Sequence, residues 1–517
     1  MSATDVVERP VESTFRPALV LMSGRAVGFV ASFGIPIALV RIFDRADFGT
    51  YKQLFLIATT LYGIGQLGMA ESLFYFLPKA PSGAARYVAN AALSLAAGGL
   101  ACLAALVLGG PALARWLGNP DLARHTTALG VYVMLWLASA ALEIVMIARK
   151  RYRWASGLYG GLDVLRAACL VLPALVSSDL EWLVAGAVGF AAVRVAVTLA
   201  YFRREFGPEL SPDVPLFRQQ LAYAMPFALA GLVEIAQVNL HQYAVAYRFD
   251  AATFAVYAVG CLQVPLVELV TASLVNVMMV RMAEELRDGR PEAARAIWHD
   301  SARKLALLFV PLAALLMVAA RPIMVFLFTA RYAASAPIFL LSSLALLWPV
   351  LAVDGVLRVF AATRFLFALN VVRLALTVAL LWWLIGELGL IGAMAATVIA
   401  GGAARAIGLV RIGGLMNLPL AQILPWRDFG AIVGAAAIAA APAAAALPVG
   451  LELGILPALV ATGAVYGLSY AACLWSFGGI TTDEWMAARR ALARWRIGSS
   501  RAGLATEVSA PCVESRD

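Results

Sequence analysis

Charge is what this sequence lacks most. Only 14% of its 517 residues are charged, whereas 62% are hydrophobic and the mean hydropathy is +0.84. A soluble domain carries about 25% charged residues, so this composition cannot supply a water-facing surface. Apolar runs of about 20 residues recur along the chain, which is the length that crosses about 30 Å of hydrocarbon. The sequence therefore predicts an all-α polytopic membrane protein.

Cysteine and recognisable catalytic motifs are also scarce. The five cysteines include no C-x-x-C pair, which argues against a disulfide framework or a metal site. No Walker-type phosphate loop, HExxH or GxSxG motif occurs, so we expect neither an ATP-driven pump nor an enzyme, and no cofactor. The 40 basic residues, with a formal net charge of +9, fall mostly in short loops between apolar runs. They are explained by membrane topology rather than by nucleic-acid binding.

The apolar runs predict about 14 transmembrane helices in two lobes. We expect a cytoplasmic tail over 1–16, a six-helix N-lobe over 17–205, a cytoplasmic linker over 206–220, a six-helix C-lobe over 221–412, two further helices within 413–480 and a cytoplasmic tail over 481–517. The charged stretch 284–304 is rich in Ala and Arg and is interpreted as a short amphipathic helix lying at the membrane surface.

An internal repeat supports the two-lobe division. The stretch RIFDRADFGTYKQL near the start of the second expected span returns as YRFDAATFAVYAV near the start of the eighth. Phe48 and Tyr51 fall on Phe254 and Tyr257, a constant offset of 206 residues. Six crossings separate the copies, so the chain returns to the same side of the membrane. The halves are therefore predicted to be parallel repeats, an arrangement that places a binding site between the lobes.

The distribution of Lys and Arg predicts the orientation. If the N-terminus is cytoplasmic, 26 of these residues lie in inside segments, 8 in outside loops and six within spans. This bias follows the positive-inside rule and predicts that both termini are cytoplasmic.

Polar residues deep in the spans are the candidate binding groups, because charges in hydrocarbon are costly and usually face a cavity. The cavity-lining candidates are Arg25, Glu71, Arg166, Arg194, Glu234, Gln237, His241 and Glu268. Glu234, Gln237 and His241 are spaced three and four apart and share one helix face. The arginines suit an anionic substrate head, whereas Glu234 and Glu268 could bind a coupling ion or balance the arginines.

Several other deep charges are open to a structural interpretation. Asp163 and Arg166 could neutralise each other within one helix. Asp354 is expected to pair with Arg358 one turn later, and Glu143 with the basic cluster RKRYR that follows it. Arg25 and Arg194 have no charged residue three or four positions away, which favours a cavity-lining role for both.

Three stretches carry a resemblance to a known family: DRADFGTYKQL with GQLGMAESLFYFLP behind it, RPIMVFLFTARYAASAPIFLLSSLAL, and GELGLIGAMAATVIAGGAAR. Over about residues 15–412 the chain resembles the polysaccharide (Wzx-type) flippases of the multidrug/oligosaccharidyl-lipid/polysaccharide exporter superfamily. The resemblance implies an exporter (MATE-like) fold with two six-helix lobes in a V and alternating access to a cationic cavity. Among the deep charges, only Arg25 lies where family members carry a cavity arginine.

The resemblance also implies a cargo. It is an undecaprenyl-pyrophosphate-linked oligosaccharide, flipped across the bacterial inner membrane for O-antigen, exopolysaccharide or capsule synthesis. Partners would be membrane lipids and the polymerase and glycosyltransferases of the same pathway, with Na⁺ or H⁺ as the coupling ion. Alternatives are a multidrug exporter of the same superfamily, a peptidoglycan-precursor flippase, and a membrane-embedded polysaccharide polymerase or ligase. The short outside loops argue against the enzyme.

Overall fold

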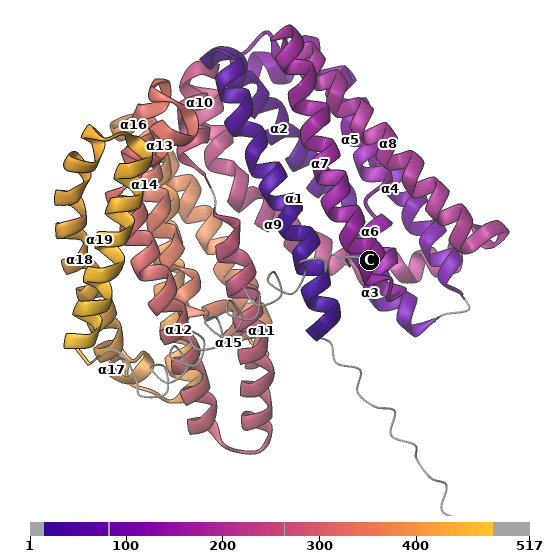
Figure 1. Cartoon of the computed structure of the whole chain (residues 1–517). Coiled ribbons are helices and arrows are strands. Elements are labelled where there is room, and N and C mark those ends of the chain that lie inside the picture. The colour runs from indigo at the N-terminus through magenta and orange to yellow at the C-terminus, as the bar shows by residue number, and fades with distance from the viewer. Residues whose placement is uncertain (1–14, 81–82, 263, 479–517) are drawn as a thin grey trace, which may run out of the picture.

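The protein forms two helical lobes arranged as a V in a computed structural model (Figure 1). The structure describes residues 15–80, 83–262 and 264–478, and these contain helices and turns but no strand. Most of both predicted tails therefore lies outside the described residues. The N-lobe consists of α1 (Phe15–Ile42), α2 (Arg45–Gln66), α3 (Met69–Lys79), α4 (Ala84–Trp116), α5 (Leu122–Ala138), α6 (Leu142–Ala148), α7 (Tyr152–Ser177) and α8 (Leu180–Phe206).

The C-lobe follows after a short connection, because α9 already begins at Val214. Its helices are α9 (Val214–Arg248), α10 (Ala251–Gly260), α11 (Pro265–Arg287), α12 (Pro291–Val318), α13 (Ala320–Phe328), α14 (Ala336–Leu344), α15 (Val353–Val359) and α16 (Thr363–Met416). After the short α17 (Leu420–Ile423), α18 (Trp426–Glu452) and α19 (Ile455–Ser476) pack side by side at the outer edge of this lobe (Figure 1). They agree with the two predicted extra spans.

Within the described residues, twelve helical segments are long and apolar enough to cross a membrane. One of them, α16, has 54 residues and would be about 80 Å long if straight. It is divided at Gly389, whose backbone is left-handed (φ 57°, ψ −130°), so it supplies two spans. The broken helix α10–α11 supplies one more, which agrees with the predicted total of about fourteen.

The repeat predicted from the sequence is visible in the turn before the second helix of each lobe. Asp44 accepts a hydrogen bond from the backbone N–H of Asp47 at 2.8 Å, and Asp250 accepts one from Thr253 at 2.9 Å. Each aspartate is the N-cap of its helix and satisfies an amide that the first turn leaves free. Both copies of the repeat therefore begin a helix by the same local chemistry.

In the described residues, four of the interrupted spans have a carboxylate directly after the break. The breaks separate α2 from α3, α5 from α6, α10 from α11, and α14 from α15. The first turns of the resumed helices carry Glu71, Glu143, Glu268 and Asp354, respectively. A helix N-terminus has a partial positive charge and free N–H groups, which stabilise a carboxylate inside a membrane. Each of these four breaks therefore provides a place that stabilises an acidic group.

The lobes meet along α9, which packs against α2, α3 and α4 of the N-lobe, and at one end of the V, at the turn between α1 and α2. Arg41 donates hydrogen bonds to the carbonyl oxygens of Leu327 and Phe326 at 2.8 and 3.0 Å, which lie at the C-terminal end of α13. Beside it, Gly49 lies directly against the Ala251 carbonyl oxygen of the other lobe. Cations and helix C-termini attract each other, so this contact joins the lobes by charge as well as by close packing.

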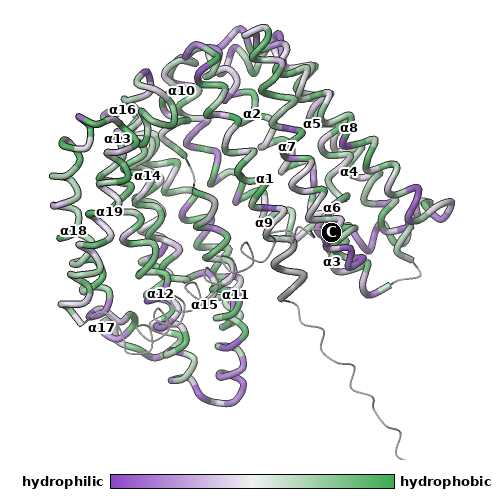
Figure 2. The backbone as a smooth tube through the Cα atoms, in the orientation of Figure 1, coloured by the Kyte–Doolittle hydropathy of each residue, from purple (hydrophilic) through white to green (hydrophobic). Residues whose placement is uncertain are grey.

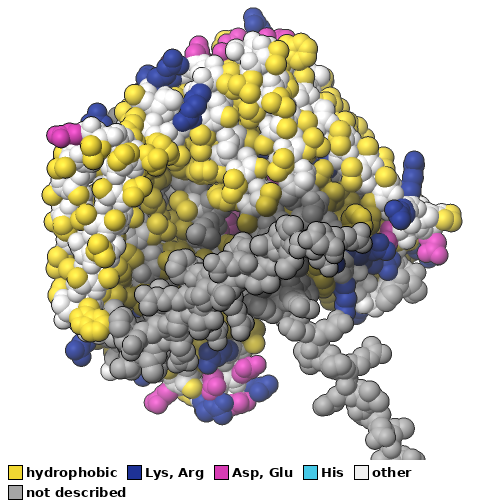
Figure 3. All heavy atoms as spheres, viewed as in Figure 1, with side chains coloured by type: hydrophobic (Ala, Val, Ile, Leu, Met, Phe, Trp, Pro, Cys, Tyr) yellow, Lys and Arg dark blue, Asp and Glu magenta, His cyan; other side chains and the backbone are white. Residues whose placement is uncertain are grey.

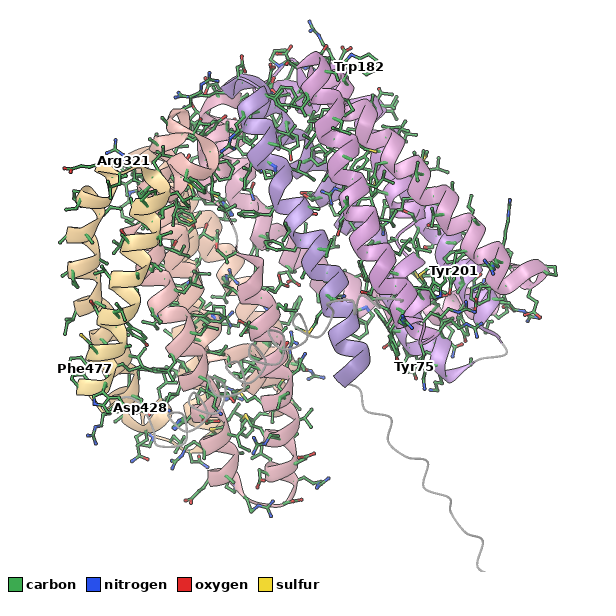
Figure 4. The ribbon with its side chains drawn as sticks, viewed as in Figure 1. Tyr75, Trp182, Tyr201, Arg321, Asp428 and Phe477 are labelled. Carbon is green, nitrogen blue, oxygen red and sulfur yellow. The ribbon has the colours of Figure 1, made fainter. Side chains whose placement is uncertain are left out.

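The outer surface has the character expected of lipid contact. Hydrophobic residues cover the flanks of both lobes, while charged side chains gather at the two ends (Figures 2 and 3). Val176 of α7 and Trp382 of α16 are each about 90% accessible. In Figure 4, Trp182 and Arg321 mark the end where the lobes meet, and Asp428 lies at the opposite end.

The predicted surface helix over 284–304 is wrong. In the structure α11 continues to Arg287 and α12 starts at Pro291, so the charged stretch forms the tip of a helical hairpin that turns at Gly289 (φ 73°). The hairpin projects at the open end of the V (Figure 1). Its charges are accommodated because both helices extend past the apolar flanks instead of lying along the surface.

Candidate functional site

Each lobe contains a polar cavity beside its interrupted helices. The N-lobe cavity has a volume of about 360 Å³ and lies among α2, α3, α5, α6, α7 and α8. Its charged lining residues are Glu71, Glu143, Asp163, Arg166 and Arg194. Three of the predicted site residues, Glu71, Arg166 and Arg194, are thus brought together, although they are far apart in sequence.

Arg194 and Glu143 form a buried ion pair in the N-lobe cavity. The Arg194 Nη2 and Glu143 Oε2 atoms are 2.8 Å apart, and the two side chains are 13% and 7% exposed. The expectation that Glu143 pairs with the basic cluster is therefore wrong. Arg194, which has no charged residue three or four positions away, finds its partner on another helix and lines the cavity. Glu205 instead binds the basic cluster, at 2.7 Å from Arg151. Glu143 follows α5 and the basic cluster precedes α7. Both reach the charged residues of α8 because α5 and α7 pack against α8.

Asp163 and Arg166 do not form the self-neutralising pair that was one interpretation of their spacing. No ion pair closer than 4.0 Å joins them among the described residues; the Arg166 guanidinium lies 5.8 Å from the centre of the Trp136 ring. The Arg166 Nε–H is buried without a hydrogen-bond partner in the described structure. A carboxylate oxygen of Asp163 lies against Gly28 of α1, where a larger residue would require the Asp163 side chain to move.

A second N-lobe opening connects Glu71 with the other lobe. This cavity of about 330 Å³ lies between the α2–α3 break and α9, and Glu71 and Glu234 both line it. Glu71 also lines the 360 Å³ cavity. Glu71 therefore borders both cavities, and Glu234 borders the one beside α9.

Gln237 and His241 are buried within the C-lobe, whereas Glu234 of the same helix, α9, lines the cavity beside the N-lobe. The Gln237 amide donates to the Asn370 carbonyl oxygen at 2.6 Å, and His241 Nδ1 lies 2.7 Å from the Tyr257 hydroxyl. Both side chains are buried. These contacts satisfy polar groups that would otherwise be costly in a membrane, so they hold α9 against α10 and α16 of the same lobe. His241 also lines the C-lobe cavity.

The C-lobe cavity is about twice as large, at about 690 Å³. Its charged lining residues are Glu268, Asp354, Arg358 and Arg405. Asp354 Oδ1 lies 2.6 Å from Arg405 Nη1. The predicted Asp354–Arg358 pair is therefore wrong, and Arg358 makes no ion pair among the described residues.

Arg25 lies outside both lobe cavities. It is exposed on α1, and its guanidinium carbon lies 5.3 Å from the centre of the Tyr159 ring. Tyr159 is itself part of the N-lobe cavity lining. Arg25 therefore stands at the rim of that cavity, where it can meet a group entering from outside the lobe.

A family model described as a polysaccharide biosynthesis protein matches residues 38–337, more than half of the chain. The chain belongs to this family. No curated protein matches the sequence of this chain. The lipid II flippase MurJ in an inward closed conformation has a similar structure, with a TM-score of 0.67 and 14% identity, covering 89% of this chain and 99% of that one.

Two other solved structures of similar fold are transporters. An inward-facing multidrug resistance MATE transporter has a TM-score of 0.56 at 14% identity, covering 77% of this chain and 94% of that one. A MOP superfamily transporter from Pyrococcus furiosus has a TM-score of 0.53 at 14% identity, covering 78% and 95%. The predicted exporter fold is confirmed, and the chain is a multi-pass membrane protein of the polysaccharide biosynthesis family.

Sequence reasoning missed a pairing that the sequence contains. Glu143 and Arg194 are 51 residues apart, and so are Asp354 and Arg405. This equal spacing in the two halves of a duplicated chain was a usable signal. Arg373 was missed as well; it lies within electrostatic reach of Arg405, Asp354 and Glu234.

Proposed function

We propose that this protein is a flippase that moves undecaprenyl-pyrophosphate-linked oligosaccharide units across the bacterial inner membrane for surface polysaccharide synthesis. Its family and its structural similarity to a lipid II flippase support a lipid-linked cargo. The V-shaped pair of lobes, closed at one end, supports alternating access. With cytoplasmic termini, the open end of the V faces the cytoplasm, where such cargo is made.

The observation that carries this proposal is the position of the charged groups. Arginines and carboxylates line cavities inside a protein whose flanks are apolar. Charges inside a membrane protein usually mark the path of a polar substrate or ion. A lipid-linked sugar needs such a polar path for its head while its chain stays in the lipid, and Na⁺ or H⁺ could be bound by the first-turn carboxylates Glu71 and Glu268.

The second candidate is export of an organic cation. The N-lobe cavity has three carboxylates against two arginines, and Tyr62 and Trp136 supply aromatic faces. Aromatic and acidic groups attract organic cations. A polymerase or ligase is less well supported, because the similar structures are a flippase and transporters.

The test is deletion of the gene in its host, followed by complementation. Loss of surface polysaccharide, with lipid-linked repeat units accumulating on the cytoplasmic side, is expected for the flippase. Purified protein in liposomes should also make a fluorescent lipid-linked oligosaccharide accessible to an external reagent. Unchanged polysaccharide together with raised ethidium retention would contradict the proposal and favour the cation exporter. Neighbouring genes for glycosyltransferases and a polymerase would identify the pathway partners.

A further inference from the structure

The same ion pair occurs at equivalent places in both lobes. Glu143 is the second residue of α6 and Asp354 the second residue of α15, and each of these helices resumes the fourth span of its lobe after a break. Their partners, Arg194 and Arg405, stand in the sixth span of the same lobe. The duplication has therefore kept one carboxylate–arginine pair in two copies.

The surroundings of the two copies differ. In the N-lobe the pair is buried, and the adjoining cavity of about 360 Å³ contains two further carboxylates and one further arginine. In the C-lobe Asp354 is 42% exposed, and the adjoining cavity is about 690 Å³. The C-lobe copy is accessible to a ligand, whereas the N-lobe copy is enclosed in a cavity with more carboxylates than arginines.

Additional arginines gather at the C-lobe copy. Arg358 lies one helical turn after Asp354 and lines the same cavity, and Arg373 is within electrostatic reach of Arg405. Neither makes an ion pair closer than 4.0 Å among the described residues. The remaining carboxylate of the cavity is Glu268 of α11. Gly355, the neighbour of Asp354, packs against Val275 of the same helix. Glu268 lies seven residues before Val275, which is about 10 Å along the helix. The cavity thus has an arginine end and a separate glutamate end.

We propose that the arginine end of the C-lobe cavity binds the diphosphate group of the lipid-linked cargo, with Arg358 and Arg405 as its ligands. This inference rests on the proposed function and assigns the anionic group of the cargo to the C-lobe. Guanidinium groups hold phosphate oxygens in bidentate pairs. Asp354 positions Arg405, because its carboxylate accepts a hydrogen bond from Nη1 and leaves the remaining N–H groups for a ligand. Arg373 adds positive potential without contacting the ligand.

The experiment measures binding of a short polyprenyl diphosphate to the purified full-length protein in nanodiscs. Arg358→Gln removes a cation whose side chain is exposed and makes no ion pair among the described residues, so the fold should be retained; Arg358→Lys keeps the charge. Arg364→Gln, at the exposed start of α16 and outside the cavity lining, is the matched control. We expect R358Q to weaken binding by about 10- to 100-fold, since hydrogen bonds between charged groups are of that strength. R358K should recover part of the loss, and R364Q should bind like the wild type.

Two comparisons decide between the outcomes. The polyprenyl monophosphate should bind more weakly than the diphosphate, and inorganic pyrophosphate should compete at higher concentration if the phosphates rather than the chain are recognised. Equal binding by R358Q and wild type, or equal losses in R358Q and R364Q, would refute the diphosphate site. If R358Q binds normally while the wild-type gene still restores polysaccharide to the deletion strain, the site is wrong and the transport function stands. If the wild-type gene restores nothing, the function itself fails.

Discussion

Breaking the buried ion pair of the N-lobe should destabilise the protein strongly. Arg194→Ala leaves the Glu143 carboxylate without its partner at a site where that side chain is only 7% exposed. Removing one member of a buried pair typically costs about 3–5 kcal/mol, because an uncompensated charge stays in a medium of low polarity. The free energy of unfolding of R194A, measured by SDS titration in mixed micelles, should fall by that amount.

A double variant separates the unpaired charge from the lost contact. Glu143→Leu together with Arg194→Met removes both charges and keeps the volume, so it should recover most of the stability that R194A loses. The matched comparison is Arg405→Ala, because its partner Asp354 is 42% exposed and solvent screens the interaction. We expect R405A to cost about 1 kcal/mol. A loss below about 0.5 kcal/mol in R194A, or no recovery in the double variant, would refute the reasoning.

Three further perturbations test the end where the lobes meet. Gly49→Val would overlap the Ala251 carbonyl oxygen, so the lobes should separate there and a cysteine introduced nearby should react faster with a water-soluble maleimide. Arg41→Ala removes the two hydrogen bonds that join α1 to α13 and should favour the separated state by about 1 kcal/mol. This would be seen as a broader spin-label distance distribution, and unchanged distances would contradict a role in closure. Asp250→Ala should cost about 1 kcal/mol through loss of the cap. Hydrogen bonds from Thr253 lower the pKa of Asp250, so its contribution should be present above about pH 4 and be lost as the pH falls through that lowered pKa. An equal acid response in D250A and wild type would contradict this.

The sequence could predict the spans because the cost of placing a residue in hydrocarbon depends mainly on the residue itself. The extra helices α18 and α19 follow from two apolar runs, and the repeat follows from Phe48 and Tyr51 recurring at Phe254 and Tyr257. The stretch 284–304 shows the limit of this reasoning. Amphipathic composition fits a helix on a surface, but only packing between α11 and α12 decides that the segment projects as a hairpin.

The partners of the deep charges were decided by the tertiary structure. Local spacing favoured Arg358 for Asp354 and the basic cluster for Glu143, whereas helix packing brings Arg405 and Arg194 to them from 51 residues away. The sequence alone determined a two-lobed membrane protein with charged residues in its spans, because hydropathy and repetition are written along the chain. Which of those charges neutralise one another and which face a cavity depends on where the broken helices cross. That is a property of the packed bundle and not of any single helix.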